Sequence, residues 1–119
     1  RVGVTSANGF AAAQAVRATG ATAALAFNDL VAVGLMNGLI DAGISVPGDI
    51  SVTGFDDIPL ARYVSPRLTT ASVPFEPLGS EAWRRLHAII SGETPDHNLV
   101  FQPRLELRDS TGPVRTLAS

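Results

Sequence analysis

The stretch ISVTGFDDIPLARYVSPRLTT, from Ile50 to Thr70, decides the fold class of this chain. It opens with an apolar run that lacks polar alternation, which is typical of a strand buried on both faces in a parallel sheet covered by helices. The run 50–54 ends at a glycine, and the adjacent carboxylates Asp56 and Asp57 follow. Because ligands of open α/β sheets bind at the carboxyl ends of the strands, we expect a binding site near these acids.

The residues before this stretch predict a strand and a helix. The apolar run 23–27 is too short for a helix and ends at Asn28-Asp29, so it indicates another buried strand. A helix over 30–42 follows, which Asn28 or Asp29 can cap and Gly43 can end. A strand, a helix and a strand within about 30 residues have the size of a βαβ unit.

The flanking segments also contain residues that begin, end or restrict predicted helices and strands. Pro77 and Gly92 bracket a helix in which apolar residues recur at spacings of three and four. Pro103 restricts the alternating segment 98–107 to an edge or bulged strand. The remaining predicted elements are a helix over 9–19 that Ser6 or Asn8 caps and Gly20 ends, and a third strand over 68–73. The order predicts an α/β fold, a parallel sheet flanked by helices.

Composition narrows the classes of function. A chain of 119 residues with 45% apolar side chains is large enough for one core, so we expect one compact unit. Nine arginines, no lysine and a formal charge of −2 give no basic cluster for DNA phosphates. No apolar run approaches the roughly 18 residues of a membrane helix, and no cysteine is present for a disulfide or a thiolate metal site. We expect a soluble protein without a membrane segment, metal or cofactor. The absence of cysteine says little about the compartment.

Polar residues follow two neighbouring predicted strands. Asn28 comes directly after one strand and Asp56 after the next, so parallel pairing brings both side chains to one edge. An amide that donates and accepts, beside a carboxylate that accepts, is suited to the vicinal hydroxyls of a sugar or ribose. Phe75 follows the third strand, where its ring can pack on the apolar face of a sugar. Asn28 can equally be a plain helix cap, and Phe75 a core residue.

The sequence offers no catalytic constellation. Adjacent acids such as Asp56 and Asp57 do not easily share one site as an acid dyad requires, and we expect Asp57 to hold its loop by a hydrogen bond. No serine, histidine and acid stand at a suggestive spacing, and neither His87 nor His97 has a second ligand nearby for a metal. We therefore expect a binding protein. A sugar-modifying α/β enzyme is the alternative, and it would need a base or nucleophile beside Asp56.

Several motifs together resemble the effector-binding domain of the LacI/GalR transcription regulators. They are NGFAAAQAV, the ND pair, VPGDISVTGFDD, PRLTT and RLELRDST, in this order between residues 8 and 111. The resemblance implies a periplasmic-binding-protein-like type I fold of two α/β subdomains, whose cleft closes on an effector, and a homodimer. It also implies an N-terminal helix-turn-helix headpiece, through which alone operator DNA would bind. We expect residues 1–111 to be the C-terminal part of such a domain and 112–119 to be a flexible tail.

The resemblance also assigns roles to residues. Asn28 and Asp56 match positions that hydrogen-bond the hydroxyls of the effector, and Val73 and Phe75 match positions that line the pocket. Val4 stands where the family often has an aromatic residue that stacks on the ligand. A periplasmic sugar-binding protein of a transport system shares the fold and is the alternative function, which a cleavable leader upstream would reveal.

The helix over 30–42 is apolar on all sides and carries glycines at 34 and 38, a spacing that lets another backbone approach closely. In the resembling family this helix and the loop after GFDD contribute to the dimer interface. The alternative is that the helix packs only within its own chain. The candidate contacts to a partner chain are Val33, Met36, Asn37, Ile40, Leu60 and Tyr63.

Overall fold

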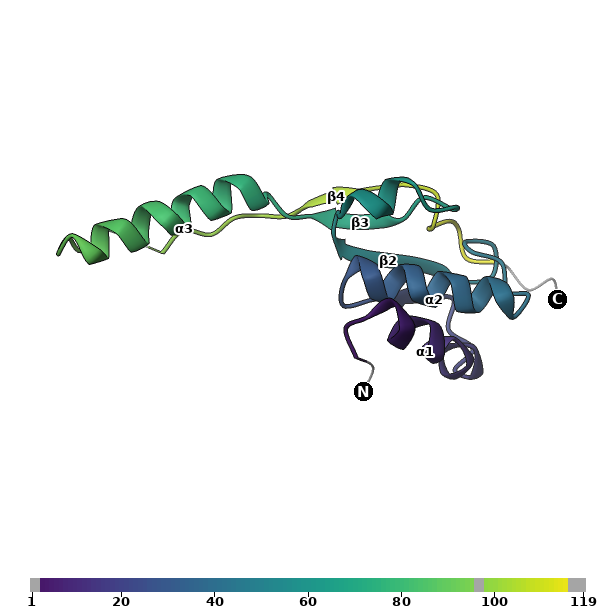
Figure 1. Cartoon of the computed structure of the whole chain (residues 1–119). Helices are drawn as coiled ribbons and strands as arrows, with labels where there is room; N and C mark the ends of the chain where they lie inside the picture. The colour runs from purple at the N-terminus through teal and green to yellow at the C-terminus, as the bar shows by residue number, and fades with distance from the viewer. Residues whose placement is uncertain (1–2, 96–97, 116–119) are drawn as a thin grey trace.

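The computed structural model describes residues 3–95 and 98–115. Its elements in chain order are α1 (Ser6–Ala18), β1 (Ala23–Leu25), α2 (Asp29–Asp41), β2 (Ser51–Asp56), the 3₁₀ helix η1 (Pro59–Arg62), β3 (Thr69–Ser72), α3 (Phe75–Ile90) and β4 (Arg104–Glu106) (Figure 1). One sheet has the strand order β1-β2-β3-β4. The first three strands are parallel and β4 is antiparallel to β3. The predicted α/β fold with a mostly parallel sheet is therefore confirmed.

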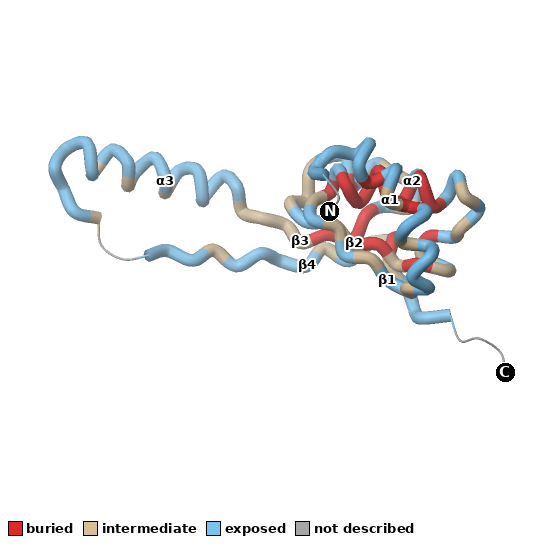
Figure 2. Tube along the Cα trace, turned by 90° about the horizontal axis from the view of Figure 1, so that it is seen from below, coloured by how far each residue is buried: buried red, intermediate tan, exposed pale blue. Residues whose placement is uncertain are grey.

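Two helices are layered on one face of this sheet. α2 packs on β2, and α1 packs on the side of α2 that is turned away from the sheet (Figure 1). The largest fully buried side chains include Met36 and Leu39 of α2, Val52 of β2 and Leu68 just before β3. The buried residues, red in Figure 2, are concentrated in the part formed by α1, α2, η1 and the sheet, which we call the body. The core therefore lies between α2 and the sheet.

Glycines allow α1 to pack closely on α2. A Cβ atom on Gly34 would overlap the carbonyl oxygen of Ser6, and one on Gly38 would lie 2.7 Å from the carbonyl oxygen of Phe10. A side chain at either position would push the two helices apart. The backbone that approaches these glycines is that of α1 in the same chain, which is one of the two alternatives that the sequence left open.

α1 begins at Ser6 rather than at Gly9, because a different residue caps it. The Thr5 hydroxyl accepts the backbone N–H of Asn8 at 3.2 Å, and the side chain of Asn8 accepts the backbone N–H of Thr5 at 3.2 Å. This reciprocal pair is a capping box. Ser6 and Asn8, the predicted caps, lie in the first turn instead. Gly20 follows the helix with a φ of 67°, as its predicted role in ending the helix requires.

The predicted burial of both strand faces is wrong for this chain. Leu25 of β1 is 84% exposed, Phe27 just after β1 is 76% exposed, and Phe55 of β2 is 40% exposed. Ala24 and Val52, their neighbours in the strands, face α2 and the core. The apolar run correctly indicated parallel strands, but within the described residues helices cover only one face of them.

α3 and the segment that leads into β4 form an arm, residues 75–95 and 98–103, which projects from the body (Figures 1 and 2). The molecule measures 66 Å along this direction and 25 Å across. No residue of α3 is buried, although its apolar side chains have the predicted helical spacing. The predicted strand over 98–107 is reduced to three residues, because the preceding segment runs beside α3. No helix of the described part of the chain is long and apolar enough to cross a membrane.

The segment after β4 returns along the sheet. The backbone N–H of Gly112 donates to the Ser51 hydroxyl at 3.1 Å, and Arg115 forms an ion pair with Asp49. These contacts hold the start of the segment 112–119 against β2 and the turn before it. The chain beyond Arg115 lies outside the described residues, so the flexible tail stays a prediction.

Replacing Gly34 by alanine in the intact protein should lower the free energy of unfolding by about 2 kcal/mol or more, as overpacked cores do. The new methyl group overlaps the backbone of α1, so the two helices must separate. Urea denaturation followed by circular dichroism measures the effect. Gly79→Ala is the matched control, because its methyl group meets open space in α3. The same loss in both variants would contradict the packing argument.

Candidate functional site

The carboxyl ends of β1, β2 and β3 bring the predicted site residues to one edge of the sheet. Asp56 is the last residue of β2 and is paired in register with Ser72, the last residue of β3. Val73 follows β3 directly, and Phe75 begins α3. Asn28 lies between β1 and α2, at the end of the strand that pairs with β2. The convergence predicted from strand ends is therefore present in the fold.

Asn28 caps a helix and still has polar groups for a ligand. Its side-chain oxygen accepts the backbone N–H of Val31 at 2.8 Å, which caps α2. Its side-chain nitrogen donates to the carbonyl oxygen of Val4 at 3.2 Å, and this bond links the chain before α1 to the same edge. An amide has two donor hydrogens and an oxygen with two lone pairs, so one of each remains. The cap and the ligand contact, which the sequence left as alternatives, are compatible.

Asp29 does not cap α2, although the sequence suggested that role. Its side chain is fully buried, and its two oxygens accept hydrogen bonds from different elements. Oδ1 accepts the Thr70 hydroxyl of β3 at 2.6 Å, and Oδ2 accepts the backbone N–H of Ile58 at 2.8 Å. A Cβ atom on Gly54 would overlap Oδ1. A glycine inside a strand can mark such a close approach, but it does not show which group approaches.

The turn after β2 has an unusual backbone. Asp56 and Asp57 have φ values of 112° and 56°, in the region that side chains other than glycine rarely adopt. Burial raises the pKa of Asp56, and the charge of Asp29 raises it further. Among the described residues no group donates a hydrogen bond to the Asp56 carboxylate. This carboxylate is therefore ready to accept hydrogen bonds from a ligand.

Asp57 holds the loop, as predicted. Its carboxylate is 6% exposed and pairs with Arg62 at 2.7 Å and with Arg108 at 2.5 Å. Arg108 also donates to the carbonyl oxygen of Leu68 at 2.9 Å. Burial alone would raise the pKa of Asp57, but hydrogen bonds from the two guanidinium groups outweigh it and leave the pKa below its usual value. These ion pairs tie the turn to η1 and to the segment after β4.

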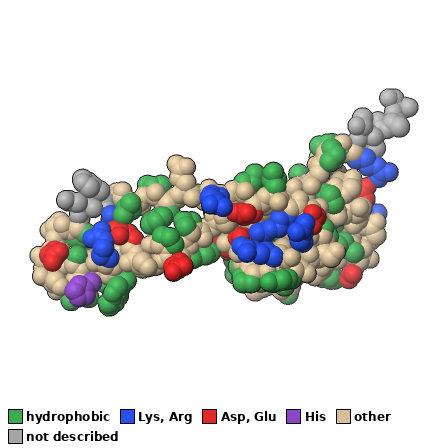
Figure 3. Space-filling model, turned by 90° about the horizontal axis from the view of Figure 1, so that it is seen from above, with side chains coloured by type: hydrophobic (Ala, Val, Ile, Leu, Met, Phe, Trp, Pro, Cys, Tyr) green, Lys and Arg blue, Asp and Glu red, His purple; other side chains and the backbone are tan. Residues whose placement is uncertain are grey.

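Four arginines near the end of the sheet and the segment after β4 are paired with acids. Figure 3 shows blue and red side chains side by side in the middle of the face. The four ion pairs are Arg62–Asp57, Arg108–Asp57, Arg67–Asp109 and Arg104–Glu106. Pairing of this kind cancels the positive charge that a DNA-binding surface would need. In the part of the chain that the structure describes, no cluster of histidines and acids could hold a metal ion.

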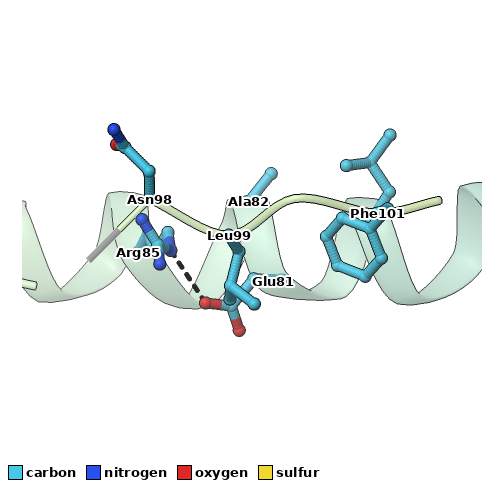
Figure 4. A pocket seen from close by; sticks show the side chains of 7 residues that line it. Glu81, Ala82, Arg85, Asn98, Leu99 and Phe101 are labelled. Carbon is cyan, nitrogen blue, oxygen red and sulfur yellow. Dashed lines mark hydrogen bonds and ion pairs between the residues drawn. The ribbon is translucent and has the colours of Figure 1, made fainter. Parts of the chain in front are cut away.

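A cavity of about 300 Å³ lies along the arm, between α3 and residues 98–101 (Figure 4). Glu81 and Arg85 on its wall form an ion pair of 2.8 Å. Hydrogen bonds from Arg84 and Arg85 lower the pKa of Glu81 to about 2. The cavity is separate from the predicted site, because none of the predicted ligand contacts lines it.

A second cavity, of about 380 Å³, lies where the arm joins the body, and Val73 and Phe55 line it. Phe55 precedes Asp56 in β2, so the two side chains leave opposite faces of the sheet. Val73 thus lines a cavity that neither Asp56 nor Asn28 lines. Phe75 is 54% exposed at the start of α3 and does not plug the core.

Comparison with known proteins identifies the fold family. Residues 2–111 match the family model of the periplasmic binding protein-like domain. The chain belongs to the periplasmic binding protein-like domain family. The transcriptional regulator GalR of Salmonella typhimurium is 42% identical over 91 residues, which are 75% of this chain and 26% of that protein. The regulator MalR of Streptomyces coelicolor is 39% identical over 104 residues, which are 87% of this chain and 30% of that protein.

Solved structures of LacI-family regulators have the same fold. One from Enterococcus faecium with bound ribose has a TM-score of 0.87 and 33% identity, and the match covers 96% of this chain and 43% of that one. One from Arthrobacter sp. FB24 in complex with lactose has a TM-score of 0.81 and 34% identity, over 93% of this chain and 43% of that one. The chain thus spans less than half of these periplasmic binding protein-like relatives. The resemblance to LacI/GalR regulators is confirmed.

Replacing Arg108 by glutamine in the intact protein should lower the free energy of unfolding at pH 7 by about 2–3 kcal/mol, because it leaves the buried Asp57 with one exposed partner. The pKa of Asp57 is lower in the folded than in the unfolded state. The contribution of the ion pair is therefore complete above the unfolded pKa and is lost as the pH falls through the folded pKa.

Urea denaturation at a series of pH values measures this difference, which should shrink in acid. Arg67→Gln is the matched control. Its partner Asp109 is half-exposed, so the loss should stay below about 1 kcal/mol. Equal losses in the two variants, or a difference that does not depend on pH, would contradict the role of Asp57.

Proposed function

We propose that this chain is the effector-sensing part of a LacI-type transcription regulator. A small polar ligand, a sugar or related polyol, binds at the edge formed by the carboxyl ends of β1, β2 and β3. Its binding alters the affinity for operator DNA of a helix-turn-helix headpiece outside this chain. The observation that carries the proposal is the placement of Asn28 and Asp56 at the ends of adjacent parallel strands. The regulators named above, and the ribose and lactose bound to two of the matched structures, support it.

The chemistry of the edge favours neutral ligands rich in hydroxyl groups. Asp56 accepts hydrogen bonds only, and its raised pKa reflects a half-buried carboxylate that lacks donors. A ligand hydroxyl supplies a charge-assisted hydrogen bond, which is stronger than a neutral one. Asn28 keeps one donor and one acceptor for a neighbouring hydroxyl. An anionic ligand is disfavoured, because Asp29 and Asp56 both place negative charge here.

Val4 and Phe75 would contribute the apolar part of the site. Val4 is 58% exposed, and Asn28 holds its backbone. It is an aliphatic side chain at a place where the resemblance implies an aromatic one, so stacking on a sugar face falls to Phe75 and to parts of the domain outside this chain. Val73 lines the cavity at the joint between body and arm, which neither Asn28 nor Asp56 lines, so it is not part of this apolar contact.

The proposed response requires that the ligand prefer one of two arrangements of the domain. A ligand shifts such an equilibrium only by the difference between its affinities for the two states. The edge seen here is open on the side away from α2, and the remainder of the domain would close it. The chain contains no group that meets operator DNA in this proposal, and the headpiece would carry all such contacts.

Two other functions are less well supported. A periplasmic sugar-binding protein shares the fold, but the relatives and matched structures named above are transcription regulators. A sugar-modifying enzyme needs a base or nucleophile near Asp56, and the acids beside it are engaged: Asp57 pairs with two arginines and Asp29 is buried. We therefore propose a cytoplasmic, non-enzymatic regulator that has no cofactor.

The proposed regulator is a homodimer, and the structure limits which side chains can meet a partner. Val33 and Met36 are 6% and 1% exposed and pack in the core of their own chain. A charge at Met36 would therefore disrupt the fold itself. The candidate contacts that remain exposed are Asn37 and Ile40 on α2, Leu60 on η1 and Tyr63 just after it.

Replacing Asp56 by asparagine in the intact regulator should weaken sugar binding by about tenfold to a hundredfold, the loss of a hydrogen bond to a charged group. Isothermal titration with a panel of neutral sugars that includes ribose and lactose measures the affinity. The pKa of Asp56 is raised in the folded state, so its ionised form costs stability at pH 7 and the variant should be no less stable. Asp41→Asn, at the exposed end of α2, is the control and should bind as the wild type does. Wild-type affinity in Asp56→Asn would remove this residue from the site.

Replacing Tyr63 or Ile40 by aspartate should weaken self-association of the intact regulator by about tenfold or more, because a charge in a packed interface stays unpaired. Light scattering coupled to size-exclusion chromatography over a range of concentrations measures the mass. Val114→Asp places the same charge at another exposed apolar position, in the C-terminal segment, and should leave the mass unchanged. A dimer of unchanged strength in all three variants would refute the proposed interface.

A further inference from the structure

The turn that carries Asp56 needs support from outside. Positive φ at two successive residues other than glycine is an arrangement that persists only where the surroundings hold it. Asp56 is paired in register with Ser72, and this pairing holds the start of the turn. Arg62 and Arg108 hold Asp57 in the middle of the turn. The side that follows is Ile58, whose backbone N–H donates to Asp29 at 2.8 Å. Asp29 is therefore the third point at which the turn is fixed.

The position of Asp29 is itself closely determined. It is the first residue of α2, where the helix dipole favours a negative charge. Its other oxygen accepts the Thr70 hydroxyl at 2.6 Å, and the missing side chain of Gly54 makes room for it. Gly54 and Thr70 are paired in register across β2 and β3, so the carboxylate stands over that pair. The buried carboxylate thus connects α2 to β3 and to the turn, and it fixes the distances between these three elements.

From these contacts we infer that Asp29 is a positioning residue for the effector site. Through its hydrogen bond to the Ile58 N–H, it holds the turn in the conformation that directs Asp56 to the ligand edge. Asp29 also helps to position Asn28, because Asn28 directly precedes it and caps the same helix. The inference rests on the proposed function only in its statement about the ligand. The effect on the turn is independent of it.

The chemistry of the two oxygens allows the role to be tested by substitution. Asparagine at position 29 can still accept the Ile58 N–H with its oxygen and can donate to the Thr70 hydroxyl with its nitrogen. Alanine offers neither bond. Thr70→Val is the matched control, because it removes the other hydrogen bond of the same carboxylate and leaves the bond to Ile58.

The experiment compares hydrogen–deuterium exchange and sugar binding in the intact protein. Mass spectrometry of peptides that cover residues 55–60 should show exchange at least tenfold faster in Asp29→Ala than in the wild type. Asp29→Asn and Thr70→Val should stay within about threefold. Titration with ribose and lactose should follow the same order, with at least a tenfold loss of affinity in Asp29→Ala alone. If Asp29→Ala does not fold, Asp29→Ser, whose side chain is too short to reach both donors, must give the same result.

Each outcome decides one claim. Unchanged exchange at 55–60 in Asp29→Ala would overturn the positioning role, whatever the ligand does. Faster exchange with wild-type sugar affinity would overturn the link between the turn and the site. A uniform increase of exchange along the whole chain, in Asp29→Ala and Thr70→Val alike, would reduce Asp29 to a general contribution to stability and also overturn the inference. Failure of the wild type to bind any neutral sugar would refute the proposed function, while the exchange result would still decide the positioning role.

Discussion

The proposed binding edge of the sheet depends on one buried carboxylate, that of Asp29, to which the described residues offer no cationic partner. Asp29 is stabilised by a hydroxyl, a backbone N–H and the start of a helix, which replace the hydration that burial removes. Such a group is costly when any of its donors is missing, so its surroundings admit little variation. Gly54 must lack a side chain, and Thr70 must present its hydroxyl toward α2. The geometry of the edge is a consequence of these demands.

Two pairs of sequence neighbours have the same arrangement, in which one residue lies at the edge and the next one holds it in place. In Asn28-Asp29 the second residue is buried and holds the fold, while the first remains half-buried at the edge. In Asp56-Asp57 the second residue is bound by two arginines, while the first receives no hydrogen bond from the described residues. Each of the two residues proposed to contact the ligand is thus anchored by its direct neighbour in sequence. A rigid anchor one residue away is an economical means of pre-organising a polar site.

The sequence predicted element order and strand ends well, because apolar runs, glycines and caps are local signals. It placed Asn28 and Asp56 at one edge and assigned Asp57 to the loop, and the structure agrees. It failed for Asp29, because an acid at the start of a helix looks the same whether it caps the helix or contacts a distant strand. It also failed for Met36, since an apolar helix does not state whether its own chain or a partner covers each face.

The joint between body and arm has a mechanical consequence. The ladder between β3 and β4 ends at the pair Ser72–Arg104, and just beyond it Pro74 and Pro103 have no N–H with which to extend the pairing. Among the described residues, no backbone hydrogen bond joins the two segments beyond this pair. The two segments thus limit how far the arm can lie from the body, and in the part of the chain that the structure describes no strand pairing beyond Ser72–Arg104 sets its angle. The cavity between Phe55 of β2 and Leu78, Leu99 and Phe101 of the arm is then the place where side chains of body and arm meet.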